Sequence, residues 1–176
     1  MKILTKAMLI AMATGSLALS SLANAATAEV VWQNPEKYTD VRPTNESRVK
    51  FRERTFKALE EYIAKLAEEL PEGDKLSMTV TNLDLAGQVW PASFAFGNAT
   101  GSDIRVIKRI DIPRITFSYS LTDSEGNVLK SAEVKLKDMA FLNTPTPFIG
   151  REDLGYEKNM LKEWFEDDLI ESLAKN

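Results

Sequence analysis

The stretch ESRVKFRERTFKALEEYIAKLAEEL, residues 46–70, decides the fold. Its apolar side chains recur at spacings of three and four residues, which is typical of a helix with one buried face; they are Val49, Phe56, Leu59, Ile63, Leu66 and Leu70. Thr44 or Asn45 can cap its start, and Pro71 and Gly73 end it. At 1.5 Å per residue, the predicted helix is about 37 Å long and can cross a four-stranded sheet.

The segments around this helix alternate between apolar and polar residues, which predicts strands with one buried face. One strand precedes the helix at residues 29–32, and another follows it from residue 76. Residues 114–122 and 128–137 predict a hairpin, because the loop between them contains Gly126, which can take a positive φ. Ile104 and Val106 indicate a further strand.

A second helix is predicted over residues 155–173, with an apolar side formed by Met160, Leu161, Trp164, Phe165, Leu169 and Leu173. The order strand, helix, several strands, helix favours an α+β fold. We therefore expect a single antiparallel sheet of about four to five strands, with the long helix and the C-terminal helix packed on one face.

Residues 1–25 have the pattern of a cleavable signal peptide: Lys2 and Lys6, an apolar stretch over residues 7–22, and small residues ending at Ala25. The apolar stretch is shorter than the roughly 20 residues of a membrane-spanning helix. Because no cysteine follows the small residues, we expect no bacterial lipid anchor at the mature N-terminus. We expect one exported α+β domain over residues 26–176, periplasmic in location, with secretion to the exterior left open.

Composition excludes several classes of function. The chain contains no Cys and no His, which removes thiolate and imidazole metal ligands and every catalytic triad that needs an imidazole base. After signal removal, 20 basic residues face 26 acidic ones, and this balance disfavours nucleic acid as a partner. We predict no cofactor, no metal and no enzymatic activity. An acid-pair hydrolase stays as a second alternative, although nothing in the pattern indicates its cleft.

Arg52 is the one charge on the apolar seam of the long helix, between Val49 and Phe56. A guanidinium at such a place is costly unless a carboxylate meets it or its stem reaches solvent. The candidate carboxylates are Asp40, Asp84, Asp111 and Asp138. The alternative is that Arg52 binds an anion.

The segment from Asn82 to Pro91 presents Asp84, Gly87 and Trp90 where a strand ends, which is a common place for ligand contacts. The same residues can instead cap the turn and cover the sheet edge. A basic run follows, consisting of Arg105, Lys108, Arg109 and Arg114. It predicts either a charged edge strand protected against aggregation or an anion-binding stripe that includes Arg109.

Taken together, these residues resemble an uncharacterised family of exported bacterial proteins, domain of unknown function 3016. The resemblance covers nearly the whole mature chain, without one diagnostic motif; it includes Val31, Trp32, Pro35, Tyr38, Asp40, Arg52, Leu70, Pro71, Gly73, the turn over residues 82–87, Ile112, Pro113, Arg114, Asp123, Gly126, Trp164 and Phe165. It implies an exported bacterial protein and brings no activity, cofactor or catalytic residue with it.

Two hypotheses for the function follow. The first is a non-enzymatic binding or accessory domain that contacts an envelope protein through its sheet or through the Trp90 loop. The second is a small-molecule or anion-binding module centred on Arg52 and the Asp84 turn. A concave pocket that contains an unpaired Arg52 favours the second, and a flat exposed apolar patch favours the first.

Overall fold

The structure is a computed structural model that describes residues 25–97, 101–143 and 154–174. Apart from Ala25, the predicted signal peptide lies outside these residues. Within them, no helix is both long and apolar enough to cross a membrane.

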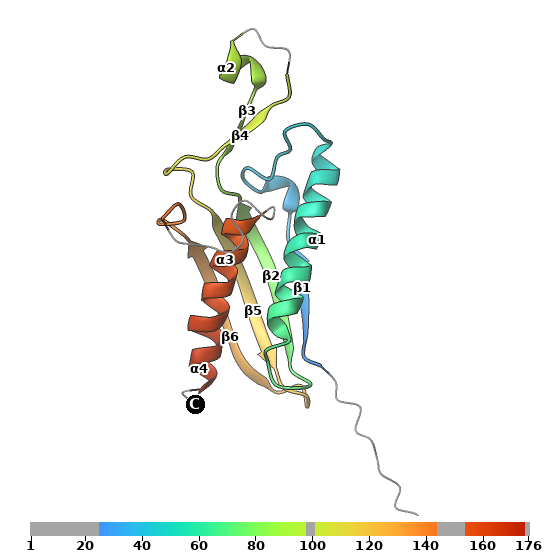
Figure 1. Ribbon diagram of the computed structural model, residues 1–176. Helices are drawn as coiled ribbons and strands as arrows, with labels where there is room; N and C mark the ends of the chain where they lie inside the picture. The colour runs from blue at the N-terminus through green and yellow to red at the C-terminus, as the bar shows by residue number, and fades with distance from the viewer. Residues whose placement is uncertain (1–24, 98–100, 144–153, 175–176) are drawn as a thin grey trace, which may run out of the picture.

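The main sheet has four strands in the order β1-β2-β5-β6, shown in Figure 1. They are β1 (Thr27–Trp32), β2 (Lys75–Asp84), β5 (Arg114–Thr122) and β6 (Val128–Lys137). β5 pairs antiparallel with both of its neighbours, but β1 pairs parallel with β2. The α+β class is confirmed, whereas the expectation of a single antiparallel sheet is wrong.

The parallel pair arises because α1 (Arg48–Ala67) carries the chain back along the sheet. β1 is followed by the short helix η1 (Pro35–Lys37), and the 20 residues of α1 then return the chain by about 30 Å. β2 consequently starts beside the start of β1, where the Thr27 amide donates to the Asp74 carbonyl at 3.0 Å. This crossover is a βαβ unit, which the order of predicted elements did not indicate.

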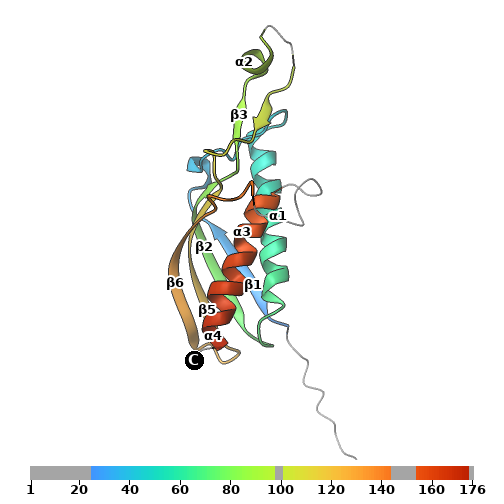
Figure 2. The ribbon, with the colours of Figure 1, turned by 60° about the vertical axis from the view of Figure 1, so that its left-hand side comes forward.

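A second, two-stranded sheet stands apart from the main sheet. It pairs β3 (Gln88–Trp90) with β4 (Ile104–Val106), and α2 (Ala92–Phe96) lies between them in the chain. Figures 1 and 2 show this unit projecting beyond the end of the main sheet. We call its described residues, 88–97 and 101–106, the arm. Ile104 and Val106 therefore form a strand as predicted, but outside the main sheet.

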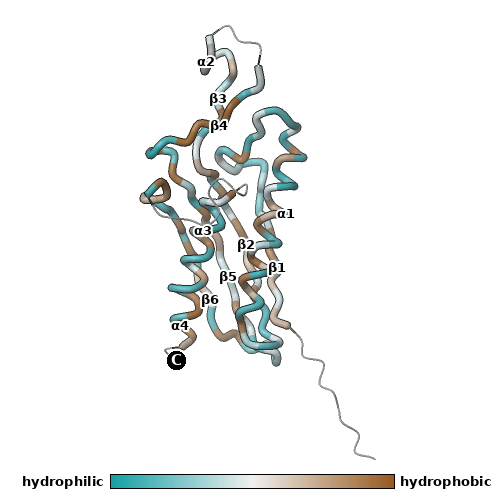
Figure 3. Tube along the Cα trace, in the orientation of Figure 1, coloured by the Kyte–Doolittle hydropathy of each residue, from teal (hydrophilic) through white to brown (hydrophobic). Residues whose placement is uncertain are grey.

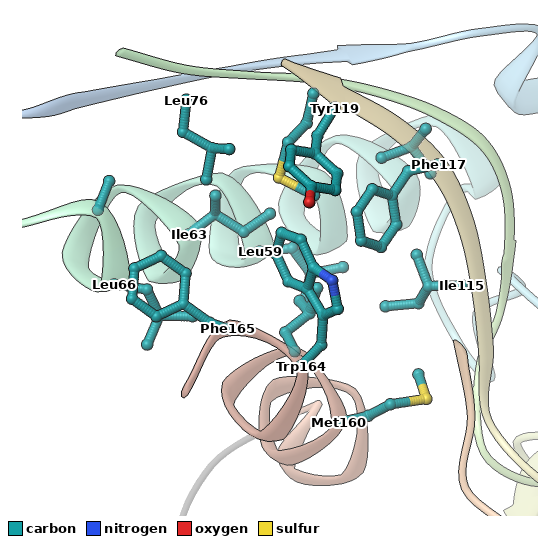
Figure 4. Packing of buried hydrophobic residues seen from close by; sticks show 14 of the residues in the cluster. Leu59, Ile63, Leu66, Leu76, Ile115, Phe117, Tyr119, Met160, Trp164 and Phe165 are labelled. Carbon is teal, nitrogen blue, oxygen red and sulfur yellow. The ribbon is translucent and has the colours of Figure 1, made fainter. Parts of the chain in front are cut away.

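The core lies between one face of the main sheet and the helices. Both helices, α1 and α3 (Gly155–Glu163), cover the same face, as expected, and both show alternating hydrophilic and hydrophobic residues in Figure 3. α3 continues through the π-helical segment η2 (Trp164–Ile170) into α4 (Glu171–Ala174). Figure 4 shows Trp164 pointing toward the sheet, where its ring lies 4.8 Å from that of Phe117 and 5.3 Å from that of Tyr119.

An aromatic cluster fixes α1 against β1. Trp32 stacks on Phe56 with ring centroids 4.1 Å apart, and its indole N–H donates to Glu60 at 2.6 Å. Tyr38 packs against the same phenyl ring, and its hydroxyl donates to the Val80 carbonyl at 2.7 Å. The polar donors of Trp32 and Tyr38 are therefore both paired, so the two rings pack against the core without an unsatisfied N–H or O–H.

The start of α1 differs from the sequence prediction. Ser47, and not Thr44 or Asn45, caps the helix, since its hydroxyl accepts from the Lys50 amide at 3.2 Å. Val49 is 53% exposed although it follows the apolar spacing. The first buried residues of α1 are Thr55 and Phe56, and in the two turns before them only Phe51 packs against the core, as a partly buried side chain.

We predict that Leu59→Ala lowers the free energy of unfolding by about 2–5 kcal/mol, because the Leu59 side chain is fully buried. Val49→Ala is the matched control, and its effect stays within about 0.5 kcal/mol. Urea unfolding followed by circular dichroism measures both. Equal losses in the two variants contradict the packing described here.

Candidate functional site

The arm leaves the main sheet at Gly87. This residue has φ +78°, and its N–H donates to the Asp111 carbonyl at 3.0 Å. A Cβ placed on it would lie 2.6 Å from the Val106 carbonyl oxygen and 2.5 Å from a methyl group of Ile107. Only glycine fits here, because both the backbone conformation and the space exclude a side chain.

Arg105 holds the base of the arm. Its Nη1 donates to the carbonyls of Ala86 at 3.2 Å and Gly87 at 3.1 Å, and its Nη2 donates to those of Asp40 at 2.8 Å and Arg42 at 3.0 Å. One guanidinium thereby joins β4, the segment after β2 and the loop before α1. Burial lowers the pKa of Arg105, while the charges of Glu157, Asp40 and Asp84 oppose that shift. An arginine nevertheless stays charged at neutral pH.

The outer part of the arm carries two aromatic rings. Trp90 and Phe94 meet edge to face with centroids 5.2 Å apart. The Lys108 ammonium lies 4.7 Å from the Trp90 ring and also pairs with Asp111 at 3.4 Å. Trp90 is half-buried, whereas Phe94 is 73% exposed. The predicted Trp90 loop is thus a hairpin unit that presents a phenyl ring to solvent.

Asp84 lies at the end of β2, where it faces Arg114 of β5. The two side chains form an ion pair at 2.9 Å. Burial raises the pKa of Asp84, and the neighbouring Arg114 opposes this rise. Since the carboxylate is already paired across the strands, Asp84 fixes the end of the sheet next to the arm.

The remaining predicted site residues lie apart from one another. Arg52 is half-buried and, among the described residues, has no ion-pair partner. Arg109 is exposed in the turn between β4 and β5. The structure places Trp90 in the arm, Gly87 directly before it and Asp84 near its base, but it does not bring Arg52 to them.

A cavity of about 390 Å³ lies beside the arm base. We call it the α1–α3 pocket, because its lining comes from the start of α1 (Phe51, Arg54, Thr55), the start of α3 (Leu154, Gly155, Tyr156, Glu157), the loop before α1 (Arg42, Thr44, Asn45, Glu46) and the arm base (Leu85, Ala86, Arg105, Ile107). Arg52 does not line it. Arg54 at its rim pairs with Glu46 at 2.7 Å.

Glu157 is the most deeply buried charged group of this pocket. It is 2% exposed, and its Oε1 accepts from the Ala86 amide at 2.7 Å. Burial raises its pKa, while hydrogen bonds from the backbone and the charge of Arg105 act in the opposite direction. Within the described residues, no cluster of three or more acidic side chains is arranged to hold a metal ion.

Sequence reasoning missed Glu157, Thr55 and the role of Arg105. Thr55 carried a signal, since it lies four residues before Leu59 on the buried face of the helix. Glu157 stands among polar residues at the start of a helix, and Arg105 stands in a basic run, so neither position is marked by its neighbours.

A family model described as protein of unknown function (DUF3016) matches residues 26–167. No curated protein and no solved structure matches the chain.

We predict that Gly87→Ala destabilises the protein more than Gly126→Ala does. Both glycines have a positive φ, so alanine costs about 1–2 kcal/mol at either position. Nothing lies within 4 Å of a Cβ at Gly126, whereas backbone atoms crowd a Cβ at Gly87. Thermal unfolding of the two variants provides the comparison. An equal shift in melting temperature would show that the arm base has room for a side chain.

Proposed function

Since the chain belongs to the family described as protein of unknown function (DUF3016), we propose from its structure that it is a non-enzymatic docking domain. It acts as an exported accessory protein whose arm binds another protein of the bacterial envelope. The partner offers an apolar recess for Phe94, and carboxylates border that recess.

This proposal rests on the observation that the arm projects beyond the main sheet. A two-stranded hairpin is marginally stable by itself, and within the part of the chain that the structure describes this one is hydrogen-bonded to the body at its base, through Arg105. It nevertheless holds an exposed phenyl ring against an indole at its outer part. Aromatic side chains that enter a pocket of a partner are typical centres of protein interfaces. The arm thus holds Phe94 in an exposed position, away from the protein's own core.

The charge of the residues next to the arm favours a partner surface that carries carboxylates. The whole chain has a net charge of −4, yet Lys108 and Arg109 follow the arm directly and Asp103 is the one acid among residues 88–110. Arg109 is exposed and, within the described residues, has no ion-pair partner. A recess bordered by carboxylates complements this cation, which favours the correct orientation and rejects cationic surfaces.

A photo-cross-linking experiment tests the proposal. A benzoylphenylalanine at position 94 of the full chain, irradiated in intact cells, is expected to give one dominant adduct with an envelope protein. The same probe at Ser118, which is exposed on the main sheet, serves as the matched control. Arg109→Glu reduces the position-94 adduct, because it places a carboxylate against the partner's carboxylates. Lys65→Glu, an exposed charge reversal in the last turn of α1, leaves the adduct unchanged.

Mass spectrometry identifies the adduct, and purified partner and chain then give the dissociation constant directly. The proposal is contradicted if positions 94 and 118 capture the same proteins, if neither captures any, or if the two charge reversals act equally.

A further inference from the structure

We infer that a groove between β6 and the C-terminal helix binds an extended basic segment of another protein. The segment adds as a further strand to the edge of the main sheet, and its lysine or arginine side chains, at every second position, lie against the acids of η2. We call this place the β6–η2 groove. No residue of the arm lines it, and the inference does not depend on the docking function.

The groove has an apolar bottom and an acidic rim. Its volume is about 260 Å³, and its lining consists of Leu136, Lys137, Asp138, Met160, Glu163, Trp164, Asp167 and Asp168. Met160 and Trp164 are each 4% exposed, whereas the acids of the helix are exposed. This volume is below the usual range for small-molecule sites, roughly 300–1,000 Å³, and suits side chains laid across the groove.

The acids of the rim attract cations. Among the described residues, Asp167 and Asp168 have no ion-pair partner. Lys130 reaches the Asp168 main-chain carbonyl and the Ser172 hydroxyl rather than a carboxylate. A lysine or arginine of a bound segment can pack its aliphatic stem on the apolar bottom and place its charged head at the rim.

β6 offers main-chain partners beside these acids. In the part of the chain that the structure describes, this strand of 10 residues pairs with β5 alone, and Figure 2 shows it at one side of the main sheet. The core-facing side chains of β5 are buried, but on β6 Ala132 is exposed and Val134 and Leu136 are half-buried. An added strand can therefore use the unpaired N–H and C=O groups and cover this apolar edge.

The indole N–H of Trp164 is an unpartnered donor in the same groove. Trp164 is buried, lines the groove, and has no hydrogen bond from its N–H within the described residues. Figure 4 shows its nitrogen on the side of Ile115, which opposes Leu136 of the groove in the sheet register. Buried indole N–H groups usually find an acceptor. A carbonyl or hydroxyl of a bound strand supplies one.

The charges of β6 require the basic residues of the segment to alternate. Lys135 and Lys137 neighbour the core-facing Leu136, so they belong to the outer face of the sheet. Lysines on both sides of an added strand would be repelled there. A second copy of this chain fits less well than a peptide, because pairing of two β6 edges about a two-fold axis sets Asp167 and Asp168 of both copies on one face of the joint sheet.

Fluorescence anisotropy with three labelled peptides and the full chain tests this inference. Acetyl-KTKTKTKT-amide places all its lysines on one side of an extended strand, acetyl-KKKKTTTT-amide has the same composition in block order, and acetyl-ETETETET-amide reverses the charge. We expect the alternating basic peptide to bind at least about tenfold more tightly than the block peptide, and the acidic peptide not to bind.

Paired variants assign the acids. Asp167→Asn together with Asp168→Asn weakens the alternating peptide by about tenfold, because two ion pairs are lost. Glu68→Gln together with Glu69→Gln, which removes two adjacent exposed acids at the end of α1, is the matched control and leaves binding unchanged. Both double variants lose the same net charge, so nonspecific attraction would weaken equally in the two.

Amide hydrogen exchange separates strand addition from attraction by charge alone. The alternating peptide is expected to slow exchange along β6 and to leave β1, the opposite edge of the sheet, unchanged. The indole N–H resonance of Trp164 shifts in the same titration, while those of Trp32 and Trp90 stay in place.

Four results overturn the inference: equal binding of the alternating and block peptides, equal losses for the two double variants, slowed exchange at β1 as large as at β6, or protection of the β6 edge before any peptide is added. None of them affects the cross-linking of position 94, so failure of the groove and failure of the docking function are distinguishable.

Discussion

The structure around the arm depends on one guanidinium. Arg105 donates four hydrogen bonds to main-chain carbonyls, and these carbonyls belong to residues 40, 42, 86 and 87. A partly buried cation is usually stabilised by a carboxylate, but here carbonyl dipoles take that role and Asp40, Asp84 and Glu157 act only through their longer-range charge. Because the four acceptors come from two separate segments, their alignment fixes where the arm leaves the body.

The same junction connects the arm with the α1–α3 pocket. The Ala86 carbonyl accepts from Arg105 at the base of the arm, and the Ala86 amide donates to Glu157 in the wall of the pocket. One residue therefore contacts both. Arg105 and Ile107 themselves line the pocket. The base of the arm and the wall of the pocket therefore share residues.

Patterns among neighbouring residues predicted the helices and strands. The direction of β1 and the role of Arg105 depend on contacts between residues far apart in the sequence. The predicted strand ranges 114–122 and 128–137 match β5 and β6, because alternation and a glycine turn are properties of neighbouring residues. The direction of β1 depends on where α1 returns the chain, which no local pattern contains. Gly87 and Trp90 could be singled out from the sequence because the properties that matter belong to the residue type: glycine can adopt a positive φ, and tryptophan has a large apolar ring. The role of Arg105 depends on carbonyls up to 65 residues away, which explains why the sequence placed it only in a basic run.

Amide hydrogen exchange on an Arg105→Lys variant tests the central claim, that this guanidinium positions the arm on the body. An ammonium group has three donors and no planar fork, so it cannot serve four carbonyls in two segments. The account predicts faster exchange at the Gly87 amide and along β3 and β4, with unchanged exchange at Met78 and Tyr119 in the middle of the main sheet. Unchanged exchange throughout, or acceleration that is as large in the main sheet as in the arm, would contradict it.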